Sequence, residues 1–136
     1  MVIVATSDAQ LATALGEAIN DVDGYITRVD SPTDLRHQVH SRQPTVVVLD
    51  VRLGKNTFRS LGEVPGILMT RSRPAVIVIL PWESKDVRRE AVKLGCFDVI
   101  YLGQDAFGEE VAHAVDEAKA ARAAGFLASV PPVTLH

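Results

Sequence analysis

The sequence predicts a doubly wound α/β domain, in which a five-stranded parallel sheet carries helices on both faces. Three short segments, at residues 2–5, 45–50 and 76–80, are almost entirely apolar, as expected of strands buried on both faces. Segments with helical spacing of apolar residues alternate with strand-like segments along the chain. This alternation favours parallel β-α-β connections over antiparallel hairpins.

The bulk composition fits one globular domain. The chain has 136 residues, of which 47% are hydrophobic and 23% charged. A net charge of −3 and a pI near 5.7 argue against a general attraction to nucleic acid or anionic lipid. No apolar stretch approaches the roughly 20 residues of a membrane span, and the first residues carry no basic leader or secretory pattern. We therefore expect a cytoplasmic protein without membrane contact.

The first elements are a strand, a helix and a second strand. After the strand at residues 2–5, Ser7 and Gln10 form a candidate capping box for a helix. Its apolar residues recur at helical spacing: Leu11, Leu15, Ala18 and Ile19. The helix should end near residues 21–24, and residues 25–29 predict the second strand.

The middle of the chain begins with a second helix. Ser31 is a typical N-cap, and Pro32 is suited to the first helical position. Leu35 and Val39 should face inward, and the helix should end before Pro44. The strand at residues 45–50 follows. Glycine and proline interrupt residues 55–73, so we expect a short or broken third helix there.

The last third repeats the alternation. After the strand at residues 76–80, Ser84 should cap a fourth helix that Gly95 closes. Residues 98–101 predict a fifth strand, and Asp105 should start the last helix. One stripe of that helix should face the core: Phe107, Val111, Val115, Ala118 and Arg122.

The sequence also predicts the extent of the domain and the roles of its cysteine and of one histidine pair. Residues 1–123 are expected to form the domain, and residues 124–136, which contain two consecutive prolines, a tail or linker. Cys96 is the only cysteine, so no intrachain disulfide is possible. His37 and His40 share a helical face but lack a third ligand, so no metal site is predicted there.

The predicted order of elements, with Asp50 ending a buried strand, resembles the receiver domain of bacterial two-component response regulators over about residues 1–123. The matching segments are LDVRLG around Asp50, VIVILP in the fourth strand, and AVKLGCFDVIYL from the fourth helix into the fifth strand. The resemblance implies a flavodoxin-like sheet with strand order 2-1-3-4-5. It also implies that Asp50 stands at the phosphoacceptor position.

The other positions of the family's phosphorylation site depart from its pattern. In that family two acidic residues after the first strand help to hold Mg²⁺, and a Ser or Thr and a Lys contact the phosphoryl oxygens. Here these positions hold uncharged residues: Thr6, Ser7, Leu80 and Leu102. The position of the family's reporting aromatic falls on Val99.

The sequence therefore predicts a degenerate, or pseudo-, receiver without enzymatic activity, cofactor or metal. Neutral hydroxyls and leucines cannot replace the cations that aspartyl phosphorylation needs. We expect Asp50 to lie in partly apolar surroundings without a cation, so that Asp50→Asn should be neutral or slightly stabilising. Asp8 could complete an acidic pocket, or it could serve as a helix cap. The alternative is a phosphorylatable receiver that uses Asp8 and Asp50 around Mg²⁺.

The expected working surface is the fourth helix, fifth strand and fifth helix, the face that receivers commonly use to dimerise or dock. Its candidate contact residues are Trp82, Arg88, Arg89, Val99 and Tyr101. The predicted function is a signalling and protein-interaction module that binds a protein partner or a second copy. Nucleic acid binding by this domain alone is not expected. A further alternative is the N-terminal regulatory domain of a pilus-assembly ATPase, which receiver-like domains with such losses can form.

Overall fold

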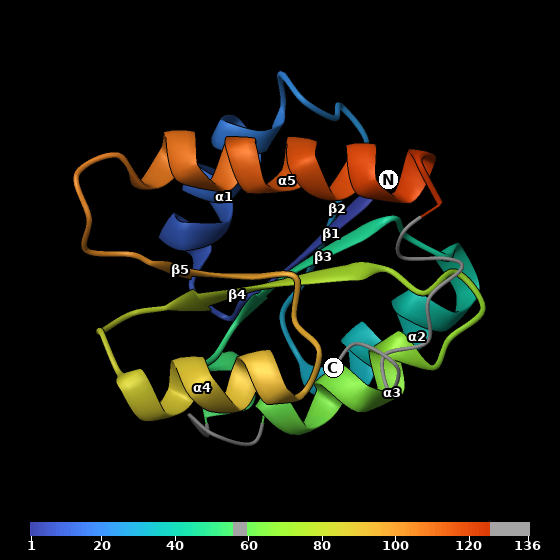
Figure 1. Cartoon of the computed structure of the whole chain (residues 1–136), viewed down its shortest axis with the longest axis horizontal. Helices are drawn as coiled ribbons and strands as arrows, with labels where there is room; N and C mark the ends of the chain where they lie inside the picture. The colour runs from blue at the N-terminus through green and yellow to red at the C-terminus, as the bar shows by residue number, and fades with distance from the viewer. Residues whose placement is uncertain (56–59, 126–136) are drawn as a thin grey trace.

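A computed structural model describes residues 1–55 and 60–125 of the chain. Its described part contains one parallel sheet with helices on both faces (Figure 1). The strands are β1 (Val2–Ala5), β2 (Ile26–Val29), β3 (Val46–Asp50), β4 (Ala75–Leu80) and β5 (Asp98–Tyr101). The helices are α1 (Ala9–Ile19), α2 (Pro32–Arg42), α3 (Val64–Leu68), α4 (Lys85–Lys93) and α5 (Phe107–Ala123). Two 3₁₀ turns, Leu53–Lys55 and Ser60–Glu63, precede α3.

The strand order is β2-β1-β3-β4-β5, which confirms the predicted fold class and order. Strand β1 pairs with both β2 and β3, so the order reverses between β1 and β3. Ligands of open α/β sheets bind beyond the carboxyl ends of the strands at such a reversal. Asp50, the last residue of β3, pairs in register with Ile79 of β4 and lies at that end.

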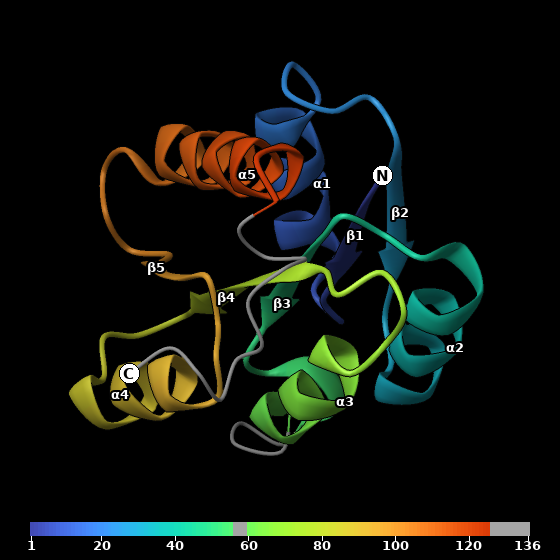
Figure 2. The same ribbon diagram turned by 45° about the vertical axis from the view of Figure 1, so that its right-hand side comes forward.

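Alternate residues of the strands point to opposite faces of the sheet and pack into two separate apolar layers. Ile3, Val47 and Val78 face α2, α3 and α4, whereas Val4 and Val48 face α1 and α5. Figure 2 shows the two helical layers on opposite sides of the sheet. Helices cover β1, β3 and β4 on both faces of the sheet, so side chains on both faces of these strands are buried. This explains why their sequences are almost entirely apolar.

Most helix boundaries follow from local capping. Ser31 caps α2 by accepting a hydrogen bond from the amide of Asp34, and Pro32 is the first helical residue, as predicted. Ser84 caps α4, and Gly95 follows that helix with a φ of +96°. The broken third helix is also observed, because only five residues form α3.

Two predicted helix starts are wrong. Asp8, not Ser7, caps α1, because its carboxylate accepts from the amides of Gln10 and Leu11. The Ser7 hydroxyl instead donates to the carbonyl of Asp30. Asp105 does not cap α5, which begins at Phe107 without a side-chain cap. Residues 126–136 of the predicted tail lie outside the described residues.

Asp23 ties the first residue to α5 and to the start of β2. Its Oδ2 lies 3.4 Å from the amine of Met1 and 3.3 Å from Nζ of Lys119, and its Oδ1 accepts from the amide of Tyr25. Burial opposes ionisation of this carboxyl, but the Tyr25 amide and the two cations outweigh it, so the pKa of Asp23 is lowered.

The lowered pKa predicts a contribution to acid sensitivity. A carboxyl with a depressed folded pKa stabilises the fold above its unfolded pKa and loses this effect as the pH falls below about 4. Asp23→Asn should therefore cost about 1 kcal/mol at pH 7 and progressively less in acid. Urea unfolding from pH 7 to pH 3 measures the difference. An equal cost at both ends of that range would contradict the assignment.

Candidate functional site around Asp50

Asp50 is buried at the carboxyl end of β3, with only 1% of its surface exposed. Its Oδ2 accepts a 2.7 Å hydrogen bond from the hydroxyl of Thr6, which follows β1. Its Oδ1 accepts a 2.9 Å hydrogen bond from the backbone amide of Arg52. A carboxylate this deeply buried needs such partners, because desolvation without them is costly.

The guanidinium of Arg52 lies directly on this carboxylate. Its Nε is 3.2 Å from Oδ1 of Asp50 and its Nη2 is 3.2 Å from Oδ2, so the contact is bidentate. The expectation that Asp50 has no cation is therefore wrong. The chain turns immediately after β3, where the amide of Val51 still bonds to Ile79. This turn allows a long side chain two residues further on to fold back over the strand end.

Asp8 joins the cluster from the start of α1. Its Oδ1 caps the helix, while its Oδ2 lies 3.6 Å from Nη2 of Arg52. The hydroxyl of Thr6 also accepts from the amide of Asp8, so one hydroxyl connects both acids. Asp8 thus has both roles that the sequence left open, as a cap and as an acid beside Asp50. Ser7, Asp8, Asp50 and Arg52 line an open pocket of about 250 Å³.

Leu80 and Leu102 are packing residues. Leu80 ends β4 and is buried in the layer under α2 to α4, and Leu102 packs against the layer under α1 and α5. The amide of Leu102 donates to the carbonyl of Leu80, which fixes the end of β5 against β4. Neither side chain can donate a hydrogen bond or supply a charge to the pocket beside Asp50.

Two carboxylates, those of Asp8 and Asp50, lie at this pocket, and both already contact Arg52. The described residues contain no group of three or more Asp, Glu, His or Cys side chains that could hold a metal. Mg²⁺ prefers an octahedron of oxygen ligands, but Arg52 contacts both oxygens of Asp50. A cation would first have to displace this guanidinium.

The predicted contact residues on α4 and β5 differ in how free they are. Trp82 is 42% exposed, and Arg89 is exposed, with a long 3.9 Å contact to Asp86 as its one ion pair among the described residues. Arg88 is 38% exposed but fixed in place, because it pairs with Glu83 at 2.9 Å and donates to the carbonyl of Val99. Sequence spacing alone could not distinguish the two neighbouring arginines.

Val99 and Tyr101 project from β5 to different depths. Val99 is buried, with 7% of its surface exposed, whereas Tyr101 is half-buried. The tyrosine ring lies against Gly103, where an added Cβ would clash with the phenolic oxygen of Tyr101. Gly103 therefore gives Tyr101 its place at the end of β5.

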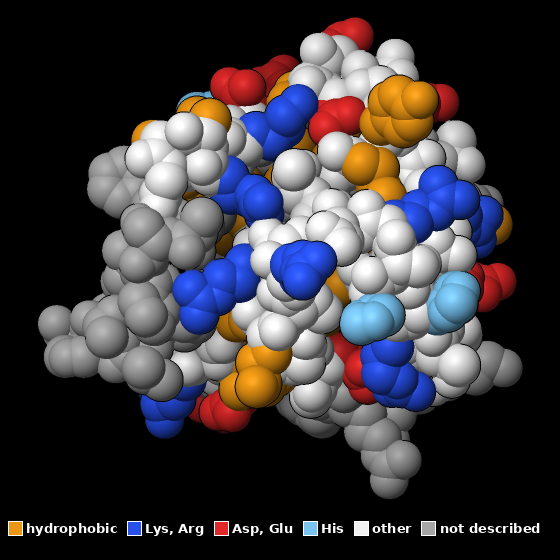
Figure 3. All heavy atoms as spheres, turned by 90° about the vertical axis from the view of Figure 1, so that its right-hand side faces the viewer, with side chains coloured by type: hydrophobic (Ala, Val, Ile, Leu, Met, Phe, Trp, Pro, Cys, Tyr) orange, Lys and Arg blue, Asp and Glu red, His pale blue; other side chains and the backbone are white. Residues whose placement is uncertain are grey.

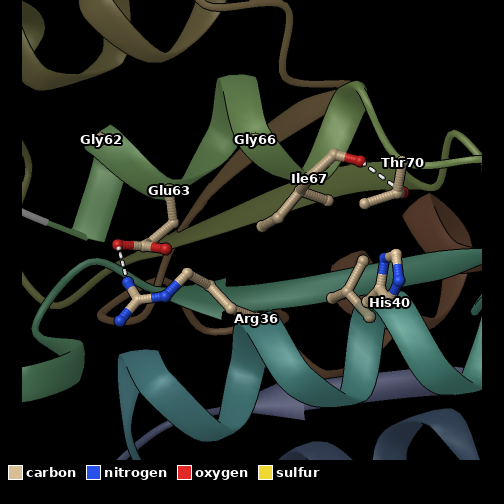
Figure 4. Close-up of a pocket in the computed structure, with 8 residues that line it drawn as sticks. Arg36, His40, Gly62, Glu63, Gly66, Ile67 and Thr70 are labelled. Carbon is tan, nitrogen blue, oxygen red and sulfur yellow. Dashed lines mark hydrogen bonds and ion pairs between the residues drawn. The ribbon is translucent and has the colours of Figure 1, made fainter.

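A cavity larger than the pocket beside Asp50 lies elsewhere in the described part of the chain. It has about 540 Å³ and lies between α2 and α3 (Figure 4). Val39 and Ile67 contribute apolar surface, and Arg36 at one end is neutralised by Glu63 at 2.8 Å. The sequence contained no signal for this groove, because its shape depends on the packing of two helices.

Cys96 shows no sign of reactivity. It is partly buried and packs against the layer under α2 to α4, and burial raises the pKa of its thiol to about 12. Its thiolate is therefore scarce at neutral pH, which argues against a nucleophilic role. No helix within residues 1–55 and 60–125 is long and apolar enough to span a lipid bilayer.

Comparison with known proteins supports the fold. No family model matches the chain, and no curated protein matches its sequence. Among solved structures, the receiver domain of NtrX from Brucella abortus superposes with a TM-score of 0.76 at 14% identity, covering 87% of this chain and 97% of that one. The putative response regulator NarL from Mycobacterium tuberculosis has a receiver domain that gives a TM-score of 0.72 at 16% identity, with coverage of 87% and 94%.

A third similar structure is a response regulator from Burkholderia pseudomallei with a phosphorylated aspartic acid, a calcium ion and citrate. It gives a TM-score of 0.73 at 14% identity, covering 95% of this chain and 74% of that one. At these identities the likeness establishes the fold alone. The class of domain is thus the receiver fold, a doubly wound sheet with an aspartate at the end of its third strand.

Proposed function

We propose that this chain is a receiver-type signalling domain that binds proteins and does not accept a phosphoryl group. The observation that carries the proposal is the bidentate contact of Arg52 with Asp50. Arg52 already binds the carboxylate before any reaction, so it stabilises the ground state as much as the transition state of phosphoryl transfer. A contact of this kind does not lower the activation barrier for attack by the carboxylate. It also obstructs the approach of a phosphodonor to both oxygens.

The rest of the pocket supports the same proposal. Transfer to an aspartate gathers negative charge, which enzymes offset with metal ions and cationic or hydrogen-bonding side chains placed beforehand. Thr6 and Ser7 are neutral, and Leu80 and Leu102 face the apolar layers. The rival function, a phosphorylatable receiver, would need Asp8 and Asp50 to bind Mg²⁺ after Arg52 has moved away. The similar structures reported above give no support to a pilus-assembly ATPase domain.

Incubation with a small phosphodonor and Mg²⁺, followed by intact mass measurement, tests this proposal. We expect no phosphoryl adduct on the folded wild-type chain. A matched variant, Arg52→Asn, removes the guanidinium and shows whether that residue is what excludes the donor. A stoichiometric adduct on the wild type that Asp50→Asn abolishes would establish the rival function.

The proposed docking face comprises α4, β5 and α5. Trp82, in the segment before α4, and Val92, within α4, expose 42% and 64% of their surfaces, and partially exposed apolar side chains of this kind act as anchors at interfaces. Arg89 is the suitable residue for a charge-reversal test, since reversing Arg88 would break its bonds to Glu83 and Val99. The partner is a second protein or another copy of this chain.

A further inference from the structure

The groove between α2 and α3 has no part in the function proposed above. Val39 on the α2 side and Ile67 on the α3 side, both nearly buried, give it apolar surface. Arg36 and Glu63 pair at 2.8 Å across one end, as Figure 4 shows, so their charges offset each other. Its volume of about 540 Å³ lies in the range of ligand pockets. An apolar, uncharged occupant therefore suits this groove best.

Two glycines keep the α3 side of the groove open. Gly62 and Gly66 line it, and a Cβ added at either position would meet no atom within 4 Å among the described residues. Neither glycine has a positive φ, so the backbone conformation does not require glycine at these positions. What the missing side chains provide is space beside Ile67.

Helix α5 ends next to the segment that leaves α3. In the last turn of α5, Nη1 of Arg122 donates to the carbonyls of Ser72 at 2.7 Å and Arg73 at 3.0 Å. Ser72 lies two residues after Thr70, which lines the groove. Gly125 follows the helix with a φ of +86°, a common way for a chain to turn away from a helix axis. Figure 3 shows this end of the molecule, where apolar side chains are exposed among arginines and histidines.

The residues after Gly125 have the composition that the groove suits. Residues 126–136, outside the described part of the chain, read FLASVPPVTLH and contain no Asp, Glu, Lys or Arg, whereas 23% of the whole chain is charged. Apolar side chains gain from leaving water. The two prolines favour an extended form in advance, so less conformational entropy is lost when such a segment binds.

The length of this segment matches the groove. At about 1.5 Å per residue, the α3 side from Gly62 to Thr70 is about 12 Å long. Residues 130–133, the sequence VPPV, cover about 12 Å when extended at roughly 3.1 Å per residue. Residues 126–129 supply about 13 Å of connection from Gly125. One copy of the chain can therefore place its own segment in its own groove.

We propose that residues 130–133 bind intramolecularly in the groove between α2 and α3. Their apolar side chains cover Val39 and Ile67 and use the space beside Gly66. This contact involves neither Asp50 nor α4, and so goes beyond the function proposed above. The same segment of a second copy and an apolar segment of another protein are the alternative occupants, which the experiments below distinguish.

Disulfide trapping in the full chain tests the contact. Cys96, the only native cysteine, is first replaced by alanine. Gly66→Cys is then combined with Val130→Cys in one variant and with Val133→Cys in another. Under mild oxidation, at least one pair should form a disulfide within a single chain, identified by intact mass and peptide mapping. The matched control replaces Gly66→Cys by Gly16→Cys on α1, where an added Cβ also meets no atom within 4 Å. The control should link about tenfold more slowly or less, because a disulfide needs Cα atoms within roughly 7 Å.

A variant that fills the groove gives a second readout without added thiols. Gly66→Leu places a side chain in the space that the segment needs. Chymotrypsin cleavage after Phe126 and Leu127, followed by intact mass, should become about tenfold faster, since cleavage tracks the population of the unbound segment. Gly16→Leu is the control and should be cleaved at the wild-type rate. If thermal melts show that Gly66→Leu does not fold, Gly62→Leu replaces it.

The outcomes separate the three occupants. Linked monomers whose yield does not change on dilution, together with faster cleavage of Gly66→Leu, support the intramolecular contact. Linked dimers whose yield falls on dilution would assign the groove to the segment of a second copy and overturn it. Equal linking in the groove and control pairs, with a cleavage rate that Gly66→Leu does not change, would also overturn it and leave the groove to another protein.

Discussion

Arg52→Ala should lower the free energy of unfolding by about 2 kcal/mol, because it leaves a buried carboxylate without its cation. Asp50 is 1% exposed and, among the described residues, would keep the Thr6 hydroxyl and one backbone amide as its hydrogen-bond partners. The Arg52 side chain is itself 36% exposed, so solvent screening places the expected cost below the roughly 3–5 kcal/mol of fully buried pairs. Urea unfolding of both proteins at neutral pH gives the difference.

A double-mutant cycle with Asp50→Asn isolates the interaction. In the wild type this change removes a bidentate ion pair and should cost about 1–2 kcal/mol. With Arg52 already replaced by alanine, it removes an uncompensated buried charge and should be neutral or stabilising. The sequence alone predicted the neutral outcome in the wild type as well, since it did not place Arg52 on Asp50. An Asp50→Asn effect that is equal in both backgrounds would show that the two side chains are not coupled.

Strand identity was accessible to sequence reasoning because burial on both faces leaves a strong signal, whereas the strand order came only from the resemblance to receiver domains. The apolar residues of a segment such as 45–50 fit neither an amphipathic helix nor a strand with one solvent-exposed face. Because the segment lies between two helical segments, it is expected to pair in parallel with the neighbouring strands. The same reasoning located Asp50 at a strand end. Cap positions were less accessible, since Ser7 and Asp8 are adjacent and both are good N-caps. Only the conformation of the turn determines which of them reaches the free amides of α1.

The Arg52 contact could not have been inferred from spacing. Arginine two residues beyond a strand end is compatible with a side chain in solvent, on a helix or over the sheet, and its many rotamers give no preference. What selects the inward rotamer is the buried carboxylate, whose desolvation is offset by a bidentate partner. The sequence therefore predicted where the candidate site lies, but not that a cation contacts its carboxylate. Because of this contact, Asp50→Asn is expected to destabilise the wild type, whereas the sequence predicted a neutral or slightly stabilising effect.

Arg122→Ala should also be strongly destabilising, by about 2–3 kcal/mol, since hydrogen bonds from a charged donor are worth more than neutral ones. The Nη1 atom of Arg122 donates to the carbonyls of Ser72 at 2.7 Å and Arg73 at 3.0 Å, and it lies 3.5 Å from the carbonyl of Thr45. It thereby joins the end of α5 to the segments that lead into β3 and β4. Burial lowers the pKa of Arg122, but guanidinium remains charged at any pH the fold tolerates.

Two matched variants separate this role from a general effect of charge. Arg122→Lys keeps the positive charge but has a single nitrogen without the planar fork, so it should recover only part of the lost stability. Arg71→Ala removes an exposed arginine that has no salt bridge among the described residues, and it should cost about 0.5 kcal/mol or less. Urea unfolding of the four proteins in one buffer gives the ranking. Equal losses for Arg122→Ala and Arg71→Ala would mean that the carbonyl contacts of Arg122 contribute nothing, and that the end of α5 is held by its apolar stripe alone.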